Sequence, residues 1–335
     1  MTPLDHLLLL SALTAVFTLA AGNIRSAGWI ATLLYGAQGL ALAKMWGLGY
    51  GPGNVESSLG FQLLGHSLHW RFDSLSWFFA LITIGAGFFS SWFASGGWAD
   101  QYRKQGHSLR LFHSALALNV FSMLVLLASG DLLSLFIGWE LVSWASFLIM
   151  ALASPRAMGY AMRYLIYAIA GAMAILMGLV MVYGQTGSFE YAALANAAPA
   201  MSPATLWTLL ALFAGGFGVK MALVPFHLWQ AKAYAETPGP GAAFLGAISS
   251  RMGLFALILV VVQLIGIGRL LQLSVPFSFL DARDLLAWIA VFTMIFPTYI
   301  ALRQHDARRL LAWHGVGQTG YMLLGVVIAD DLGSA

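Results

Sequence analysis

The sequence of 335 residues contains no cysteine, and only 9% of its residues are charged. Without cysteine the chain offers no disulfide, no thiolate nucleophile and no iron–sulfur ligand. A soluble globular domain carries about a quarter charged residues, so this composition excludes that class. We expect no cofactor in this chain, and any redox group of the system then has to be held by a partner.

Motifs for covalent chemistry are also missing. The sequence has no metal-ligand spacing, Walker motif, dinucleotide fingerprint or nucleophile elbow. The net charge of +3 comes from basic residues scattered through short loops, which does not indicate a nucleic-acid site. We therefore expect no catalytic chemistry in this chain by itself and no nucleic-acid partner.

What the chain does contain is apolar sequence, at 60% of its residues. Runs long enough to cross a hydrocarbon core of roughly 30 Å recur about ten times. They lie near residues 4–22, 27–48, 74–94, 110–130, 132–152, 158–183, 204–228, 241–266, 284–302 and 308–329. The pattern predicts an all-α polytopic membrane protein of about ten helices, whose first helix is retained because no basic region precedes it. The longer connections, 49–71 and 184–203, are predicted to be surface loops.

The basic residues are divided unequally between the two sides of these spans. Ten lie in loops after odd-numbered spans: Arg25, Arg103, Lys104, Arg110, Arg156, Arg163, Lys232, Arg303, Arg308 and Arg309. Four lie on the opposite side: Lys44, Arg71, Arg269 and Arg283. Because cytoplasmic loops are enriched in Lys and Arg, this predicts a multi-pass protein of the bacterial inner (plasma) membrane with its N-terminus outside.

One lysine, Lys220, lies inside the apolar run at residues 211–229, ALFAGGFGVKMALVPFHLW. Three glycines precede it and Pro225 follows it, so the sequence predicts a broken helix there. A charge within the bilayer costs several kcal/mol unless it faces protein, water or a counter-charge. A broken helix with an ionisable group near mid-membrane is a recurrent ion site. The alternative is that Lys220 extends along its own stem to the nearer surface.

Glu140 is the predicted partner of Lys220. It lies about eight residues into the fifth span, and Lys220 lies about eight residues from the end of the seventh, so both have a similar predicted depth. A carboxylate and an ammonium at one depth can neutralise each other and share a hydrated pocket. Loosening the pair makes proton release from Lys220 easier, which predicts a proton switch. The alternative is a purely architectural ion pair between two helices.

Three further residues are candidates for the same path. Arg251 lies about ten residues into the eighth span and does not exchange protons near neutrality, so it is either a fixed positive charge or an anchor. His227 and His314 titrate near neutrality and suit a proton relay, although a lone histidine can equally be a hydrogen-bonded core residue. Residues predicted to hold water beside them are Tyr234, Ser249, Ser250, Gln318 and Thr319.

Three linked motifs resemble a known family. They are GWELVSWASFLIM, then GVKMALVPFHLW followed by ETPGPGAAFLGAISSRMG, then DARRLLAWHGVGQTGYMLLG. In this order and spacing they resemble the antiporter-like membrane subunits of respiratory complex I. The same family includes the large subunits of Mrp-type sodium/proton antiporters and of energy-converting hydrogenases and formate hydrogenlyases. The resemblance covers roughly residues 70 to 330, and it implies a proton-translocating bundle of two inverted five-helix repeats.

The resemblance also implies roles for single residues. Glu140 falls on the family's essential glutamate of helix five, and Lys220 on the lysine of its broken helix seven. Arg251 stands where the family usually has a lysine or histidine on helix eight. In WQAKAY the family usually has tryptophan, leucine, proline, aspartate, alanine and histidine, so Lys232 and Tyr234 replace its acidic and histidine members.

The resemblance divides the chain into three parts. Residues 1–100 form the first three helices, 101–270 a complete five-helix repeat (helices four to eight), and 271–335 the start of the second repeat. The family's exit-side lysine or glutamate on helix twelve would fall beyond Ala335. The sequence is therefore expected to be one piece of a split or truncated subunit, to be completed by a partner, or not to pump alone.

These observations favour a proton-translocating subunit of a complex I-like or membrane-bound hydrogenase-like complex. Its partners would be other membrane subunits, including a further antiporter-like chain. An Mrp-type sodium/proton antiporter subunit is the alternative, although Glu140 is the one deep carboxylate and sodium prefers oxygen ligands. A third possibility is a non-conducting scaffold that holds partners in the membrane.

Overall fold

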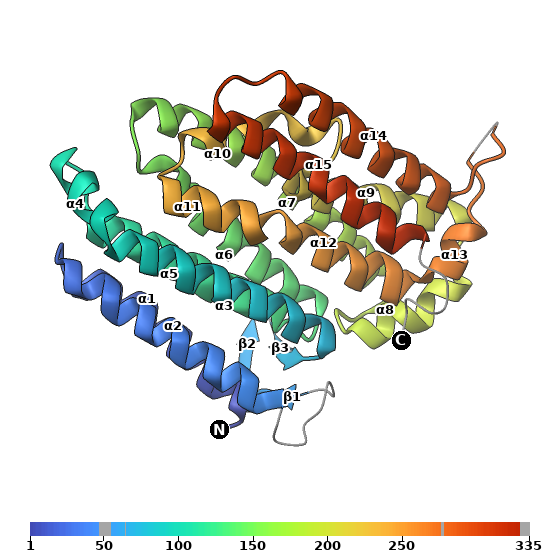
Figure 1. The fold of residues 1–335 in the computed structure, drawn as a ribbon. Coiled ribbons are helices and arrows are strands. Elements are labelled where there is room, and N and C mark those ends of the chain that lie inside the picture. Colours follow the sequence, from blue (N-terminus) through green and yellow to red (C-terminus); the bar gives the residue numbers. More distant parts are fainter. Residues whose placement is uncertain (47–54, 64, 276–277, 329–335) are drawn as a thin grey trace. The chain divides into compact units, whose positions relative to one another are not determined.

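The computed structural model describes residues 1–46, 55–63, 65–275 and 278–328. Helices dominate the described chain (Figure 1). Packing divides it into two compact units. Unit 1 consists of Met1–Leu165 and Glu236–Ser249, and unit 2 consists of Ile166–Ala235 and Ser250–Ala335. The repeat-based boundaries at residues 100 and 270 stay a prediction.

Unit 1 is built on five long helices: α1 (Pro3–Ala20), α2 (Arg25–Met45), α3 (Ser74–Ser95), α5 (Leu109–Leu127) and α6 (Leu132–Ala151). Helix α1 packs on α2 and α5, α2 packs on α3, and α5 packs on α6. Four of the five begin at a residue whose side-chain oxygen accepts a hydrogen bond from a backbone N–H of the first turn: Thr2, Asp73, Ser108 and Asp131. These caps satisfy donors that a helix start leaves unpaired.

Shorter elements complete unit 1. They are α4 (Gly97–Lys104), the start of α7 (Pro155–Thr186), α11 (Gly239–Phe244) and the π-turn η4 (Leu245–Ser249). The predicted loop 49–71 holds small antiparallel pairs, β1 (Val55–Glu56) with β4 (Arg71–Phe72) and β2 (Phe61–Leu63) with β3 (His66–Leu68). Residues 49–54 and 64 of that loop lie outside the described residues.

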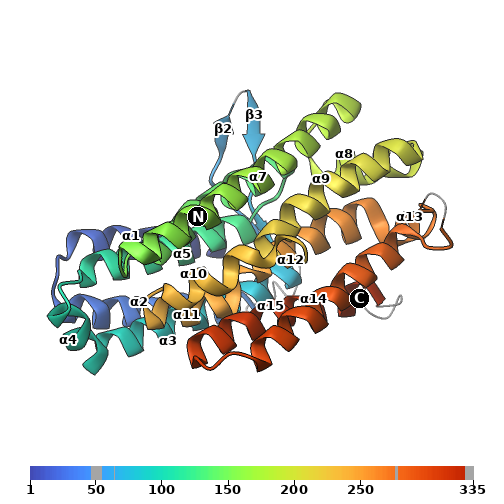
Figure 2. The ribbon, with the colours of Figure 1, turned by 90° about the horizontal axis from the view of Figure 1, so that it is seen from above.

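Unit 2 holds the rest of α7, then α8 (Tyr191–Ala197), η2 (Ala198–Ala200), α9 (Pro203–Met221), η3 (Phe226–Trp229), α10 (Gln230–Glu236), α12 (Arg251–Leu257), η5 (Ile258–Gly266), α13 (Ile267–Leu271), α14 (Ala282–Leu302) and α15 (Ala307–Ile328). Helices α14 and α15 lie side by side (Figures 1 and 2). A Cβ on Gly320 would come within 2.6 Å of the Ala290 carbonyl oxygen, so glycine is needed for this close approach.

Eight helices of the described chain are long and apolar enough to cross a membrane. They correspond to eight of the ten predicted spans. The other two predicted spans are also helical, as α2 with 21 residues and α15 with 22, but both are less apolar. The prediction of an all-α polytopic membrane protein is confirmed.

Candidate functional site

Glu140 lies near the middle of an unbroken helix. Helix α6 runs for 20 residues and begins with a capping box, in which the Asp131 side chain accepts from the Ser134 N–H at 2.7 Å. The same carboxylate accepts from the His69 N–H at 2.7 Å, which ties the segment between β3 and β4 to the start of α6. Glu140 is half-buried on this regular scaffold.

Helix α6 is fixed to α5 on both sides of Glu140. A Cβ on Gly138 would come within 2.5 Å of Leu126 Cα, so the two backbones approach closely there. Further along α6, Asn119 Nδ2 donates to the Ala145 carbonyl at 2.7 Å. These contacts restrict the movement of α6 relative to α5, and the backbone that carries Glu140 is therefore rigid within unit 1.

Lys220 lies in the last turn of α9, directly before a break. The helix ends at Met221, and Ala222 adopts the left-handed conformation with φ 55° and ψ 39°. The Leu223 N–H donates to the Gly218 carbonyl at 2.9 Å, which closes the helix end in the Schellman manner. The chain resumes at Phe226 as η3 and continues as α10. The predicted break beside Lys220 is confirmed.

The break leaves backbone groups that other parts of unit 2 satisfy. The Trp229 indole Nε1–H donates to the Val219 carbonyl at 3.0 Å. The Val224 N–H donates to Thr293 Oγ1 on α14 at 3.0 Å. Irregular backbone at membrane depth is tolerated when protein or water pairs its polar groups. These contacts therefore explain how unit 2 accommodates an interrupted helix.

Close glycine contacts fix the end of α9 that carries Lys220. A Cβ on Gly216 would come within 2.7 Å of the Gly171 carbonyl oxygen on α7. Helix α12 also approaches α9 closely, because a Cβ on Gly253 of α12 would come within 2.8 Å of the Phe217 carbonyl oxygen of α9. Lys220 itself is only 3% exposed. The prediction that its charge is inside the protein, instead of extending to the surface, agrees with this burial.

His227 lies in η3, one turn beyond the break, and is 6% exposed. Its ring lies edge-on to Phe296 of α14 at 5.7 Å between centroids, and 5.9 Å from Trp313 of α15. Neither ring nitrogen has a hydrogen-bond partner of normal geometry among the described residues. His227 is therefore a buried titratable group in a mainly aromatic setting.

Arg251 begins α12 directly after the π-turn η4 and Ser250. Its Nη2 donates to Gln318 Oε1 on α15 at 2.7 Å, and its Nη1 donates to Ser250 Oγ at 3.1 Å. The side chain is 7% exposed. Gln318 and Ser250, which were expected to hold water, thus accept from the guanidinium, and Arg251 connects α12 to α15.

His314 and Thr319 lie on the same helix as Gln318. His314 is half-buried and follows Trp313, the residue that contacts the His227 ring. Successive residues of an α-helix point about 100° apart, so His314 lies on a different face of α15 from Trp313. Thr319 Oγ1 donates to the Val316 carbonyl of its own helix at 2.7 Å, which uses its proton locally.

Gln230 is a site residue that sequence reasoning missed. It starts α10, is fully buried, and neither its amide nitrogen nor its amide oxygen has a partner among the described residues. A Cβ on Gly315 of α15 would lie 3.7 Å from Gln230 Nε2, with no other heavy atom within 4 Å, so there is room beside the amide. The signal in the sequence is a glutamine where the resembling family usually has leucine.

Glu140 belongs to unit 1, whereas Lys220, His227, Arg251 and His314 belong to unit 2. Each unit positions its own residues as described. The pairing of Glu140 with Lys220 stays a prediction. No group of three or more His, Asp or Glu side chains in the described part of the chain has the arrangement of a metal site.

Residues 129–334 match the transmembrane family model described as NADH:quinone oxidoreductase/Mrp antiporter. This match covers more than half of the chain. The chain belongs to this family. Both charged residues of the predicted pair, Glu140 and Lys220, lie inside the matched region.

Relatives in the family are subunits of larger assemblies by name. Over 232 residues the chain is 33% identical to NADH-quinone oxidoreductase subunit N of Desulforudis audaxviator, covering 69% of this chain and 44% of the relative. Over 266 residues it is 29% identical to F(420)H(2) dehydrogenase subunit N of Methanosarcina mazei, covering 78% and 51%. The chain therefore spans about half the length of these relatives.

Two solved structures share the fold. A chain of the membrane-bound sulfane sulfur reductase, an archaeal respiratory membrane complex, matches with a TM-score of 0.83 and 23% identity, over 98% of this chain and 52% of that chain. A chain of the Mrp complex from Dietzia sp. DQ12-45-1b matches with a TM-score of 0.80 and 22% identity, over 98% and 34%. At these identities the likeness shows the fold alone.

Proposed function

We propose that this chain is a proton-translocating, antiporter-like subunit of a complex I-like or membrane-bound hydrogenase-like energy-converting complex. Glu140 and Lys220 form the charge pair of one proton half-channel. When the pair loosens, the ammonium loses its counter-charge and releases a proton more readily. When the pair tightens, Lys220 retains its proton.

The observation that carries this proposal is the burial of Lys220 in the last turn of a helix that then breaks. A buried ammonium is energetically costly unless polar groups or water solvate it, so an ionisable residue within a membrane span is a candidate functional site. Lys220 also lies in the last turn of α9, where the helix dipole favours a positive charge. The family membership gives independent support for an ion-translocating role.

The neighbouring residues of unit 2 have supporting roles in this proposal. His227 relays protons on the α10 side of the break. Arg251, held by Gln318, is a fixed positive charge, because a guanidinium keeps its proton at neutral pH. His314 is a second relay candidate on α15.

Partners supply what the chain does not. The proposed complex contains other membrane subunits, including a further antiporter-like chain, and its driving force comes from a redox group held elsewhere. We place the chain in the bacterial inner membrane with the N-terminus outside, from the ten-to-four distribution of loop Lys and Arg. This chain is proposed to hold no cofactor and to bind no nucleic acid.

The decisive experiment replaces Lys220 by alanine in the intact complex reconstituted into proteoliposomes. We expect substrate-driven proton uptake to fall at least tenfold, while the matched control Lys44→Ala, at an exposed lysine of α2, keeps normal uptake. Unchanged uptake with an assembled Lys220→Ala complex would refute the proposal. A transport rate that follows sodium at fixed pH would instead favour the Mrp-type alternative. If Glu140→Gln impairs assembly but not activity, the chain is a scaffold.

A further inference from the structure

The first helices of unit 1 contain buried polar atoms that have no hydrogen-bond partner among the described residues. They are Ser11 Oγ, Tyr35 OH, Gln38 Oε1 and His113 Nδ1, and each side chain belongs to a residue that is at most 3% exposed. Leaving a buried polar group without a hydrogen-bond partner is unfavourable. These helices precede the residues matched by the family model, and the proposed proton path uses none of these four groups.

Two of these residues, Ser11 and Gln38, lie where α1 packs on α2, and Tyr35 belongs to the neighbouring turn of α2. Tyr35 and Gln38 are three residues apart on α2 and so share one face. Gln38 Nε2 donates to Thr14 Oγ1 of α1 at 2.9 Å, and Ser11 lies three residues before Thr14 on that helix. Ser11 and Gln38 therefore belong to the same helix–helix contact, whereas the Tyr35 ring, one turn of α2 from Gln38, lies against Gly87 of α3.

Polar contacts continue along α2 toward its first residue. Thr32 Oγ1 donates to Ser91 Oγ of α3 at 3.0 Å, and Ser91 Oγ donates to the Gly28 carbonyl at 3.2 Å. One turn further, a Cβ on Gly28 would overlap both Ser95 Oγ and His113 Nε2. The histidine of α5 thus reaches the same α2 face from a third helix.

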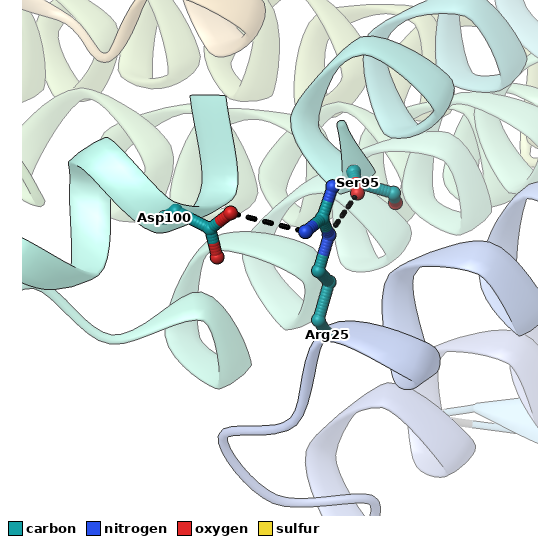
Figure 3. Close-up of polar contacts among 3 residues, drawn as sticks. All are labelled: Arg25, Ser95 and Asp100. Carbon is teal, nitrogen blue, oxygen red and sulfur yellow. Dashed lines mark hydrogen bonds and ion pairs between the residues drawn. The ribbon is translucent and has the colours of Figure 1, made fainter. Parts of the chain in front are cut away.

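The end of this path at the start of α2 is open to solvent. Arg25 Nε donates to the Ser95 carbonyl at 2.9 Å, and Arg25 Nη1 pairs with Asp100 Oδ2 at 3.0 Å (Figure 3). The two charged side chains are 43% and 51% exposed. We call the polar path from this ion pair to Gln38 the α2 seam. It consists of Arg25, Gly28, Thr32, Tyr35 and Gln38 of α2, Ser11 and Thr14 of α1, Ser91 and Ser95 of α3, His113 of α5, and Asp100 of α4.

We propose that the α2 seam is an internal water-binding site, with water bound beside its unpartnered polar atoms. Buried waters typically make about three hydrogen bonds to groups that the protein leaves unsatisfied, and the seam offers such groups on three helices. From Arg25 to Gln38 the helix rises about 20 Å, so the seam extends along most of α2. Water is the favoured ligand over a cation because Asp100, the carboxylate of the seam, already pairs with Arg25.

The test is hydroxyl-radical labelling of the intact chain in its complex, with radicals generated from water by an X-ray pulse. Such radicals modify a buried ring only when water lies beside it. We expect Tyr35 to be modified at least fivefold faster than Phe213, an equally buried ring packed against Phe217 in unit 2. Equal rates for the two rings would overturn the water site. This readout does not depend on proton transport.

A pair of variants locates the water. Gln38→Met keeps the side-chain length but removes the amide, and it is expected to lower Tyr35 labelling at least threefold. The control is Thr83→Val, because the Thr83 hydroxyl is buried and donates to the Phe79 carbonyl of its own helix at 2.8 Å. It is expected to leave Tyr35 labelling unchanged. A Gln38→Met protein with unaltered Tyr35 labelling would contradict the proposal. If that variant does not assemble, the ratio of Tyr35 to Phe213 labelling in the wild-type protein decides.

Discussion

Helices α6 and α9 each carry one charge of the proposed pair, and the two charged residues lie at different places in their helices. Glu140 lies mid-helix on α6, which is capped at Asp131 and ends at Leu152 in the right-handed conformation. Lys220 lies in the last turn of α9, which ends at Met221, and the left-handed Ala222 begins the break that follows. The carboxylate is therefore on a regular helix. The ammonium is next to a break whose backbone polar groups are paired by side chains distant in the sequence.

This difference indicates which part of unit 2 can change its backbone conformation. A mid-helix residue such as Glu140 cannot move without moving α6, because every turn on either side is hydrogen-bonded. The break beyond α9 depends on a few separate contacts, chiefly those of Trp229 and Thr293. We expect small changes at these contacts to alter the backbone next to Lys220. We therefore expect the break in α9 to be the more sensitive of the two regions.

The largest effect is expected from Gly216→Ala on α9. The new Cβ would come within 2.5 Å of Ile175 Cγ1 and 2.7 Å of the Gly171 carbonyl oxygen, so α9 must move away from α7. Overpacking of this kind costs about 3 kcal/mol at its upper range. The thermal unfolding midpoint in detergent should fall by several degrees, and proton uptake should be lost.

The neighbouring glycine provides a matched control. Gly215→Ala places a Cβ where no heavy atom lies within 4 Å, and alanine is the better helix former by about 1 kcal/mol. The thermal midpoint should therefore stay the same or rise. If the two alanine variants behave alike, the close contact of α9 with α7 is not what positions Lys220.

The next largest effect is expected from Trp229→Phe. It removes the indole N–H that donates to the Val219 carbonyl and leaves that carbonyl buried without this donor. The cost is about 1–3 kcal/mol. Proton uptake should decline several-fold while assembly persists, measured by proteoliposome transport and by subunit content. The control is Trp92→Phe, since Trp92 is 50% exposed on α3. An equal decline in both variants would mean that the hydrogen bond at the break is not responsible.

Comparison of α6 with α9 also shows what the sequence can predict. The continuous helix around Glu140 follows from its apolar run at residues 132–152, whereas its cap at Asp131 was not predicted. The break beside Lys220 was also predicted, from the glycines before it and Pro225 after it. In the structure, however, α9 runs through Gly215, Gly216 and Gly218 without interruption. Gly216 serves close packing against α7, and the break begins at Ala222, whose left-handed conformation no propensity favours.

The residues that hydrogen-bond to the backbone at the break could not be predicted from the local sequence. Trp229 lies ten residues from Val219, and Thr293 lies 69 residues from Val224. Gln318, expected to hold water, accepts from Arg251 across 67 residues. Such contacts depend on how helices pack, which a single sequence pattern does not specify. The family motifs identified the residue types of the site, and the fold determined which of them meet within unit 2.

The smallest effect is expected from Ala222→Gly, and it sharpens the comparison by stabilising the break. Ala222 has φ 55°, where an L-residue pays about 1 kcal/mol or more relative to glycine because its Cβ approaches the following carbonyl oxygen. Glycine at this helix end removes that strain, although it adds freedom to the unfolded chain, so a net gain of about 0.5 kcal/mol is expected. The thermal midpoint should rise slightly with normal proton uptake. The corresponding change on α6, Leu152→Gly, acts at a right-handed residue and should lower the midpoint. A lower midpoint for Ala222→Gly would show that the methyl group contributes packing worth more than the strain, and the break would then be held by side chains more than by backbone conformation.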